Sequence, residues 1–175
     1  MKRVALALIL FGASLALQQP LILVAALFGL LALAPLPARA AEYTLSLDGD
    51  DGAEGDPDNP WRTMAKANET LQPGDTAVFL PGEYTGVLSP ANSGRREAPI
   101  TYRSSERGKA WLVGEGDSDL ITLNGREHIT IEGFAVDGRL QGRWLQATYA
   151  HHLTIRGCTM RNTPRPISAL HCDHV

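Results

Sequence analysis

The sequence predicts an all-β chain folded as a parallel β-helix, a solenoid of about four coils with a short N-terminal capping helix. The first observation behind this prediction is an internal repeat, because the stretch 121–138 aligns with the stretch 145–162 without a gap. A fixed period of this kind is typical of stacked repeats that bury their apolar faces against one another. The matched positions are His128 with His152, Ile129 with Leu153, Thr130 with Thr154, Ile131 with Ile155 and Gly133 with Gly157.

The second observation is a change of parity within each copy of the repeat. In residues 129–131, apolar residues alternate with a polar residue, which is the pattern of a strand with one buried face. After Gly133 the apolar residues stand at Phe134 and Val136, so the buried positions change from odd to even. Since a continuous strand cannot change faces, we expect the chain to turn a corner at the glycine and enter a second sheet. The other copy changes parity at Gly157 in the same way.

The third observation is the recurrence of strand patterns through residues 75–175, the segment expected to form the coils. Apolar anchors follow one another there at nearly constant intervals, which predicts about four coils. A fifth coil has barely begun at the last residues, so the chain is expected to be truncated inside a coil. An uncapped coil leaves open strand edges, and self-association through the C-terminal coil is therefore also expected. The anchors are Val78, Ile100, Ile121, Leu145 and Ile167.

Residues 1–40 have the features of a signal peptide. Two basic residues, Lys2 and Arg3, precede an apolar tract that carries no charge until Arg39, and residues 38–40 form a small-x-small cleavage site. The tract is interrupted at Gln18-Gln19-Pro20, and its second half is shorter than the roughly 20 residues that span a bilayer. Cleavage after residue 40 predicts a secreted or periplasmic protein outside the membrane, with an uncleaved anchor as the alternative.

Residues 41–74 are expected to form a strand, an acidic loop and the capping helix. The helix is predicted over Trp61–Leu71, where apolar residues recur at helical spacing, and Pro73-Gly74 ends it. Such a helix would cover the open apolar end of the first coil. The acidic loop does not match an EF-hand, because Ala53 or Trp61 occupies the position that requires glycine. No metal site is predicted there.

Charge is distributed unevenly along the chain. Removal of the leader leaves an excess of acidic over basic residues, and no nucleic-acid partner is predicted. Between Asp137 and Asp173 there is no acidic residue, while five arginines follow one another. An anionic ligand would therefore prefer the later coils, unless these arginines only decorate the solvated outside of the solenoid. The five are Arg139, Arg143, Arg156, Arg161 and Arg165.

Cysteine and histidine residues offer further candidates. Cys158 falls at an inward strand position, which favours a buried thiol over a disulfide with Cys172. His128, His152 and His174 fall in one column of the repeat and would stack about 4.8 Å apart. Such a column could bind a metal or move protons, or it could be a simple ladder of stacked rings at a corner.

A family resemblance rests on three stretches: SLDGDDGAEGDPDNPWRTMAKANETLQPGDTAVFLPGEYTG, NSGRREAPITYRS and LITLNGREHITIEGFAVDG. These resemble the N-terminal coils of right-handed parallel β-helix proteins of the pectate-lyase-like superfamily, and within it the group that contains alginate lyases and chondroitinase B. The resemblance implies a secreted, lyase-like protein that acts on an acidic polysaccharide. It leaves calcium possible as a cofactor, although the residues themselves show none. The catalytic lysine, arginine and calcium carboxylates of these enzymes have no matching positions here, so no catalytic residue is assigned.

A uronate lyase neutralises a carboxylate, removes a proton and expels a leaving group, and arginine suits the first task. Trp144 could stack against a sugar ring or pack between coils, and Tyr149 could stack or cover a turn. A non-catalytic carbohydrate-binding or surface β-helix protein and a truncated inactive product are the alternatives to an enzyme. The predicted substrate-binding residues are Arg139, Arg143, Trp144, Arg161 and Arg165.

Overall fold

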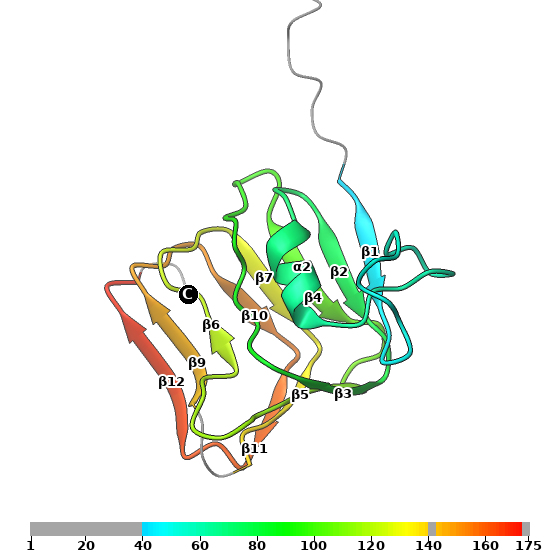
Figure 1. The fold of residues 1–175 in the computed structure, drawn as a ribbon. Coiled ribbons are helices and arrows are strands. Elements are labelled where there is room, and N and C mark those ends of the chain that lie inside the picture. The colour runs from blue at the N-terminus through cyan, green and yellow to red at the C-terminus, as the bar shows by residue number, and fades with distance from the viewer. Residues whose placement is uncertain (1–39, 140–142, 173–175) are drawn as a thin grey trace, which may run out of the picture. The chain divides into compact units, whose positions relative to one another are not determined.

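The computed structural model describes residues 40–139 and 143–172, which form twelve strands and one short helix (Figure 1). The helix is α2 (Met64–Thr70). The strands are β1 (Glu42–Leu45), β2 (Thr76–Phe79), β3 (Gly82–Thr85), β4 (Ile100–Ser104), β5 (Ala110–Val113), β6 (Ile121–Thr122), β7 (Ile129–Glu132), β8 (Ala135–Asp137), β9 (Arg143–Thr148), β10 (Thr154–Arg156), β11 (Thr159–Arg161) and β12 (Arg165–Leu170).

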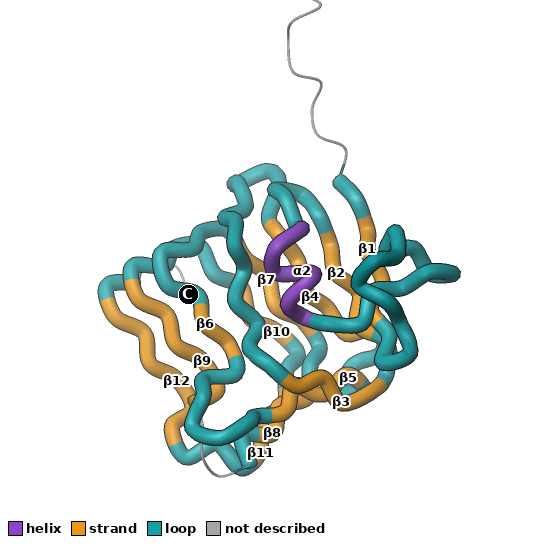
Figure 2. Tube along the Cα trace, viewed as in Figure 1, coloured by secondary structure: helices purple, strands orange, loops and turns teal. Residues whose placement is uncertain are grey.

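The strands form three parallel sheets, and the chain visits the sheets in turn as it winds. Sheet A has the order β1-β2-β4-β7-β10, sheet B the order β3-β5-β8-β11, and sheet C the order β6-β9-β12. Short loops join successive strands in most coils (Figure 2). This arrangement is a parallel β-solenoid of about four turns and confirms the predicted fold class.

The corner predicted at the repeat glycines is present. Gly133 has φ 75° and Gly157 has φ 66°, a left-handed conformation that glycine adopts without a side-chain clash. β7 ends immediately before Gly133, and β8 begins just after Phe134. Phe134 and Val136 are both fully buried, so the predicted change of inward parity is confirmed.

Other corners use residues that adopt this conformation less readily than glycine. Among the described residues, six non-glycine residues have positive φ between 47° and 54°, which is strained for most side chains. Four of them stand at matching places in successive coils, so the strain there belongs to the repeat and not to one local turn. The matching pairs are His128 with His152 and Tyr149 with His171, whereas Arg139 and Asn162 are offset by one residue at the same corner.

One hydrophobic core runs through the described coils and includes side chains from all three sheets and from α2. Phe79 lies within it, with Tyr84 and Phe134 packed edge-on at ring distances of 5.0 and 5.1 Å. Edge-on aromatic pairs add about 0.5–1.5 kcal/mol beyond their buried area. The helix contributes Met64 and Ala67 to the same core, as its predicted capping role requires.

The helix is shorter than the predicted span of residues 61–71. Trp61 instead forms a parallel bridge with Leu45, which extends sheet A beyond β1. Thr63 is the N-cap, because its side chain accepts a hydrogen bond from the Lys66 amide at 3.2 Å. Asp51 Oδ1 accepts a hydrogen bond from the Thr63 amide at 2.9 Å, which fixes the position where the helix begins. Apolar spacing alone could not locate a helix start that depends on a distant carboxylate.

The predicted spacing of the early coils is wrong in one respect. Ile100 pairs with Ile129 in sheet A, so it does not share a column with Ile121. Ile121 lies in sheet C, where it pairs with Leu145, and Leu145 pairs in turn with Ile167. The repeat period seen in the sequence therefore holds for the later coils, whereas the coil from β4 to β7 is longer because it contains the polar loop around residues 114–120.

Most of the predicted signal peptide, residues 1–39, lies outside the described residues, and its cleavage stays a prediction. Within the described ranges, no helix is long and apolar enough to cross a membrane. Cys158 and Cys172 are both free and half-buried, and burial raises the pKa of the Cys158 thiol.

Candidate functional site

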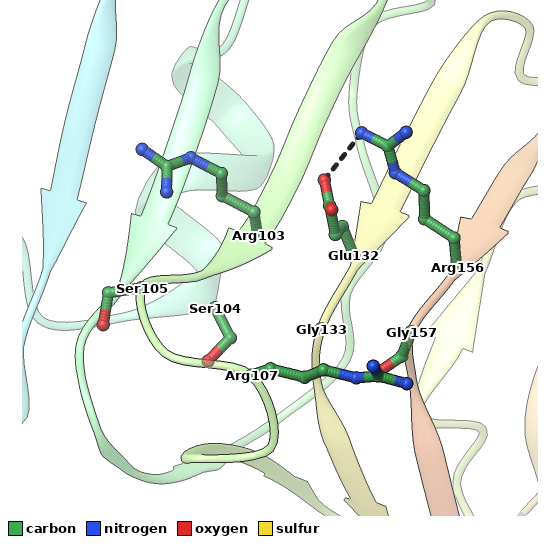
Figure 3. A pocket seen from close by; sticks show the side chains of 8 residues that line it. All are labelled: Arg103, Ser104, Ser105, Arg107, Glu132, Gly133, Arg156 and Gly157. Atoms are coloured by element: carbon green, nitrogen blue, oxygen red, sulfur yellow. Dashed lines mark hydrogen bonds and ion pairs between the residues drawn. The ribbon is translucent and has the colours of Figure 1, made fainter.

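A polar hollow of about 550 Å³ lies on the outer side of sheet A, where the strands end and the chain turns toward sheet B. Side chains from three neighbouring strands and one loop line it (Figure 3). The lining residues are Arg103, Ser104, Ser105, Arg107, Glu132, Gly133, Arg156 and Gly157.

Three charged side chains of the hollow form one column across sheet A. Arg103 on β4 pairs in register with Glu132 on β7, which pairs with Arg156 on β10. Because these residues alternate with buried neighbours, all three side chains point outward. Arg156 Nη2 lies 2.9 Å from Glu132 Oε2, and Arg103 Nη2 lies 3.0 Å from Glu42 Oε2. The column thus carries two guanidinium groups around one carboxylate.

Arg107 supplies a third guanidinium from the loop between β4 and β5. Its Nε donates to the Gly157 carbonyl at 3.2 Å, and no carboxylate pairs with it within residues 40–139 and 143–172. The loop is tied to the corner below, since the Gly108 amide donates to the Gly133 carbonyl at 2.7 Å. Figure 3 shows the Arg107 side chain extending past Gly133 toward Gly157. The terminal nitrogens of this guanidinium are held in place and remain able to bind an anion.

The hollow favours an anionic ligand. Three arginines and one glutamate give its lining a net positive charge, which Glu42 beside Arg103 reduces, and two serines add hydroxyl groups. Guanidinium groups bind carboxylates and similar oxyanions through paired hydrogen bonds, and they keep their charge at any physiological pH. The openness of the hollow to one sheet face suits a polymer better than a small enclosed ligand.

Two of the arginines predicted from the sequence gather around Asp137 on sheet B. Arg161 Nε lies 2.8 Å from Asp137 Oδ2, and the Arg139 amide donates to Oδ1 at 3.0 Å. The Arg139 amide, the Asn162 side chain and Arg161 together hold the pKa of Asp137 below its usual range. Arg161 also lies over the Trp111 ring, at 4.2 Å from its centroid. These contacts orient Arg161 while more than half of its side chain stays exposed.

The other predicted residues lie on sheet C or in the core. Arg143 on β9 pairs in register with Arg165 on β12, and its Nε lies 2.8 Å from Asp119 Oδ1. Trp144 is only 4% exposed and belongs to the core, so of its two suggested roles the structure shows packing. Tyr149 is 62% exposed and stacks on His171 at 4.9 Å. The binding role of the four arginines stays a prediction.

Three ion pairs join successive coils at the same spacing as the sequence repeat. In each pair an acidic residue of one coil meets an arginine of the next, one pair on each of the three sheets or their margins. The arginine-rich stretch is therefore partly neutralised by the coil before it, and its basic character in the linear sequence overstates its charge in space. The pairs are Asp119 with Arg143, Glu132 with Arg156 and Asp137 with Arg161.

The histidine column forms as a ladder. The rings of His128 and His152 stack at 4.5 Å with an angle of 6° between their planes. His174, the third predicted member, lies outside the described residues. Across the described ranges, no group of three or more His, Cys, Asp or Glu side chains is placed to hold a metal ion.

Comparison with known proteins gives short matches in sequence. No family model matches the chain. It is 31% identical over 98 residues to the uncharacterized protein YwoF of Bacillus subtilis (strain 168), a match that covers 53% of this chain and 21% of that protein. It is 33% identical over 105 residues to alpha-1,3-galactosidase A of Akkermansia muciniphila, covering 50% of this chain and 17% of the galactosidase. The chain thus spans about a fifth of the length of the curated relatives it matches.

Solved structures match over more of the chain. A rhamnogalacturonan lyase superposes with a TM-score of 0.64 at 16% identity, covering 75% of this chain and 38% of the lyase. An alginate lyase from Paenibacillus superposes with a TM-score of 0.54 at 20% identity, covering 70% and 37%. A GH136 lacto-N-biosidase from Eubacterium ramulus gives 0.53 at 18% identity, covering 66% and 27%. These matches confirm the predicted resemblance to parallel β-helix proteins at the level of the fold.

The sequence analysis missed the hollow, although a signal for it exists. The three strands ITYR, ITIE and LTIR align position by position, which places Arg103, Glu132 and Arg156 in one outward column. A constant shift along the sequence does not reveal this column, because the interval from Arg103 to Glu132 is longer than the interval from Glu132 to Arg156. Arg107 has no such signal, since it reaches the hollow from a loop.

Proposed function

We propose that this chain contributes to a secreted, polysaccharide-active β-helix protein of lyase-like type, and that its described coils bind an acidic polysaccharide. The fold supports the first part, since structures of the same fold include proteins named as lyases of rhamnogalacturonan and alginate. Fold alone does not determine an activity, so the proposed binding of an acidic polysaccharide rests on the chemistry of the site.

The observation that carries the proposal is the gathering of Arg103, Arg107 and Arg156 in one open hollow. Each guanidinium is oriented by a contact of its own: Glu42 for Arg103, the Gly157 carbonyl for Arg107, and Glu132 for Arg156. A ligand therefore meets donors whose positions are already set, which lowers the entropy lost on binding. We assign binding, and not turnover, to these residues.

The test is the affinity of the chain for polygalacturonate, a polymer with one carboxylate on every sugar, measured by isothermal titration calorimetry. Arg107→Ala is expected to weaken binding by about tenfold, the effect of losing one well-oriented charged contact. Lys109→Ala is the matched control, because it removes one positive charge from the same loop outside the hollow. Binding should also weaken with rising salt.

Three outcomes would redirect or reject the proposal. Equal losses in the Arg107 and Lys109 variants would reduce the effect to general charge. Losses confined to Arg143→Glu or Arg161→Glu would move the site to the arginines predicted from the sequence. A neutral polymer bound as tightly as polygalacturonate would overturn the assignment of an acidic ligand.

A further inference from the structure

A second hollow, of about 300 Å³, lies on sheet A at the opposite ends of the same strands. Its lining shares no residue with the first hollow, yet it uses the same two strands, β7 and β10. Its lining residues are Arg96, Pro99, His128, Thr130, His152, Leu153 and Thr154.

The two hollows lie on one face of the sheet. Along β7 the outward residues are Thr130 and Glu132, and along β10 they are Thr154 and Arg156, because the residues between them turn inward. Thr130 pairs with Thr154, and Glu132 pairs with Arg156. From Ile129 to Glu132 the strand advances by about 10 Å. That length fits a short oligosaccharide and exceeds a single sugar.

Arg96 gives the second hollow a positive charge, carried by an exposed side chain on a turn with a fixed backbone. It stands at the tip of a tight turn that is closed by two hydrogen bonds, from the Arg95 amide to the Ala98 carbonyl at 3.0 Å and from the Ala98 amide to the Arg95 carbonyl at 2.9 Å. The Gly94 amide ties this turn to the segment just before β7 by donating to the Glu127 carbonyl at 2.8 Å. An added Cβ on Gly94 would clash with the His128 carbonyl oxygen, so only glycine permits this approach.

The histidine pair provides the polar wall of this end. His128 and His152 stack face to face, so the faces that meet are covered by one another. Both residues belong to the lining of the hollow, so a ligand there would contact this stacked pair. On the side of this hollow that faces the first one, the hydroxyl groups of Thr130 and Thr154 add hydrogen-bonding positions.

We propose that the two hollows are the ends of one elongated site, which holds an acidic oligosaccharide along β7 and β10 with an anionic group at each end. Arg96 meets the group at one end, and Arg103, Arg107 and Arg156 meet the group at the other. The inference rests on the proposed binding of acidic polysaccharide. It adds that the ligand lies along the strands, and that a single sugar cannot reach both ends.

The experiment titrates the chain with galacturonate oligomers of increasing length, from the monomer upward, and compares Arg96→Ala with Arg95→Ala. Arg95 is the matched control, because it is exposed on the same turn and does not line the hollow. Arg96→Ala is expected to weaken binding of the longer oligomers by about fivefold and to leave the monomer unchanged. Arg107→Ala should weaken binding at every length.

A second variant, His128→Asn, tests the histidine wall. Asparagine tolerates the positive φ of 54° at this corner, so the variant removes the ring while keeping the backbone. It should reproduce the length dependence seen with Arg96→Ala.

The outcomes separate this inference from the proposed function. If Arg107→Ala weakens binding at all lengths while Arg96→Ala and His128→Asn change none, the elongated site is wrong and the proposed function stands. If no oligomer or polymer binds, both are wrong.

Discussion

Neighbouring coils of this solenoid have the same strand pairing but very different burial. Leu145 and Ile167 are registered partners in sheet C, yet Leu145 is fully buried and Ile167 is 54% exposed. Val136 and Met160 are partners in sheet B, and they are 0% and 45% exposed. The sequence of a coil thus determines its register, whereas the burial of its side chains depends on what stacks on both of its sides.

The coil formed by β10, β11 and β12, here called the outer coil, is held mainly by contacts other than buried apolar side chains. Parallel hydrogen-bond ladders join it to the preceding coil in all three sheets. Ion pairs at the repeat spacing add to them, with Arg156 on Glu132 and Arg161 on Asp137. Exposed ion pairs contribute about 0–1 kcal/mol each and weaken with salt. The stability of the outer coil is therefore expected to depend on salt more than that of the inner coils.

The largest expected effect comes from truncating Leu145 and comparing it with truncation of its registered partner Ile167. Leu145→Ala should lower the free energy of unfolding by about 2–5 kcal/mol, since it removes a fully buried side chain. Ile167→Ala should lower it by less than about 1 kcal/mol, because half of that side chain is already in water. Urea unfolding followed by circular dichroism measures both. Equal losses would mean that Ile167 is buried in solution, by a second copy or by chain outside the described residues.

Two buried tyrosines of the inner coils differ in the hydrogen bonding of their hydroxyl groups. The Tyr84 hydroxyl lies 3.0 Å from both the Leu45 and Leu80 carbonyls, whereas the buried Tyr102 hydroxyl has no partner in the described part of the chain. Tyr84→Phe should cost about 1 kcal/mol, and Tyr102→Phe should gain about as much, because it removes a desolvated hydroxyl. Thermal unfolding of the two variants tests this. A loss in Tyr102→Phe would point to a bound water.

The same tyrosines predict a loss of stability in alkali. Burial raises the pKa of Tyr84 to about 12 and also raises that of Tyr102. A raised pKa means that the folded state holds its proton more tightly. The stabilisation is therefore complete below pH about 10, the ordinary pKa of tyrosine, and is lost as the pH rises toward the folded value. Tyr102→Phe should flatten this decline between about pH 10 and 12. An unchanged slope would contradict the assignment.

The smallest expected effect concerns the contact between the inner and outer coils at Asp137. The pKa of Asp137 is lowered, first by the Arg139 amide and then by Asn162 and Arg161. A lowered pKa contributes stability above the ordinary value of about 4, and this is lost as the pH falls below it. Asp137→Asn should reduce the acid dependence of unfolding near pH 3–4 by less than about 1 kcal/mol. Asp119→Asn serves as a comparison at another intercoil pair.

Much of the fold could be predicted from single residues of the repeat. Gly133 and Gly157 located the corners, because a parity change beside glycine has few structural solutions. The ring ladder of His128 and His152 followed from the constant shift between the two copies. The early coils could not be aligned, since their polar loops differ in length and a fixed period does not describe them. The start of α2 depended on Asp51, a contact without a local sequence signal.

The site was harder to predict than the fold, because its charged residues are separated by unequal intervals in the sequence. Arg139, Arg143 and Arg161 were chosen from a run of basic residues, and the structure pairs each with a carboxylate from an earlier coil. Arg107 was not chosen, although it has no such partner within the described ranges. Linear charge runs ignore acids that lie one coil away, whereas strand register reveals them.

The most direct test of the central claim is a nuclear magnetic resonance titration of the isotope-labelled chain with a galacturonate oligomer. Backbone amide shifts are expected to concentrate at residues 103–107, 132–133 and 156–157, which include the lining of the larger hollow. Shifts confined to sheet C, around Arg143 and Arg165, or to the Asp137 cluster on sheet B would contradict this claim and place the binding surface on a different side of the solenoid.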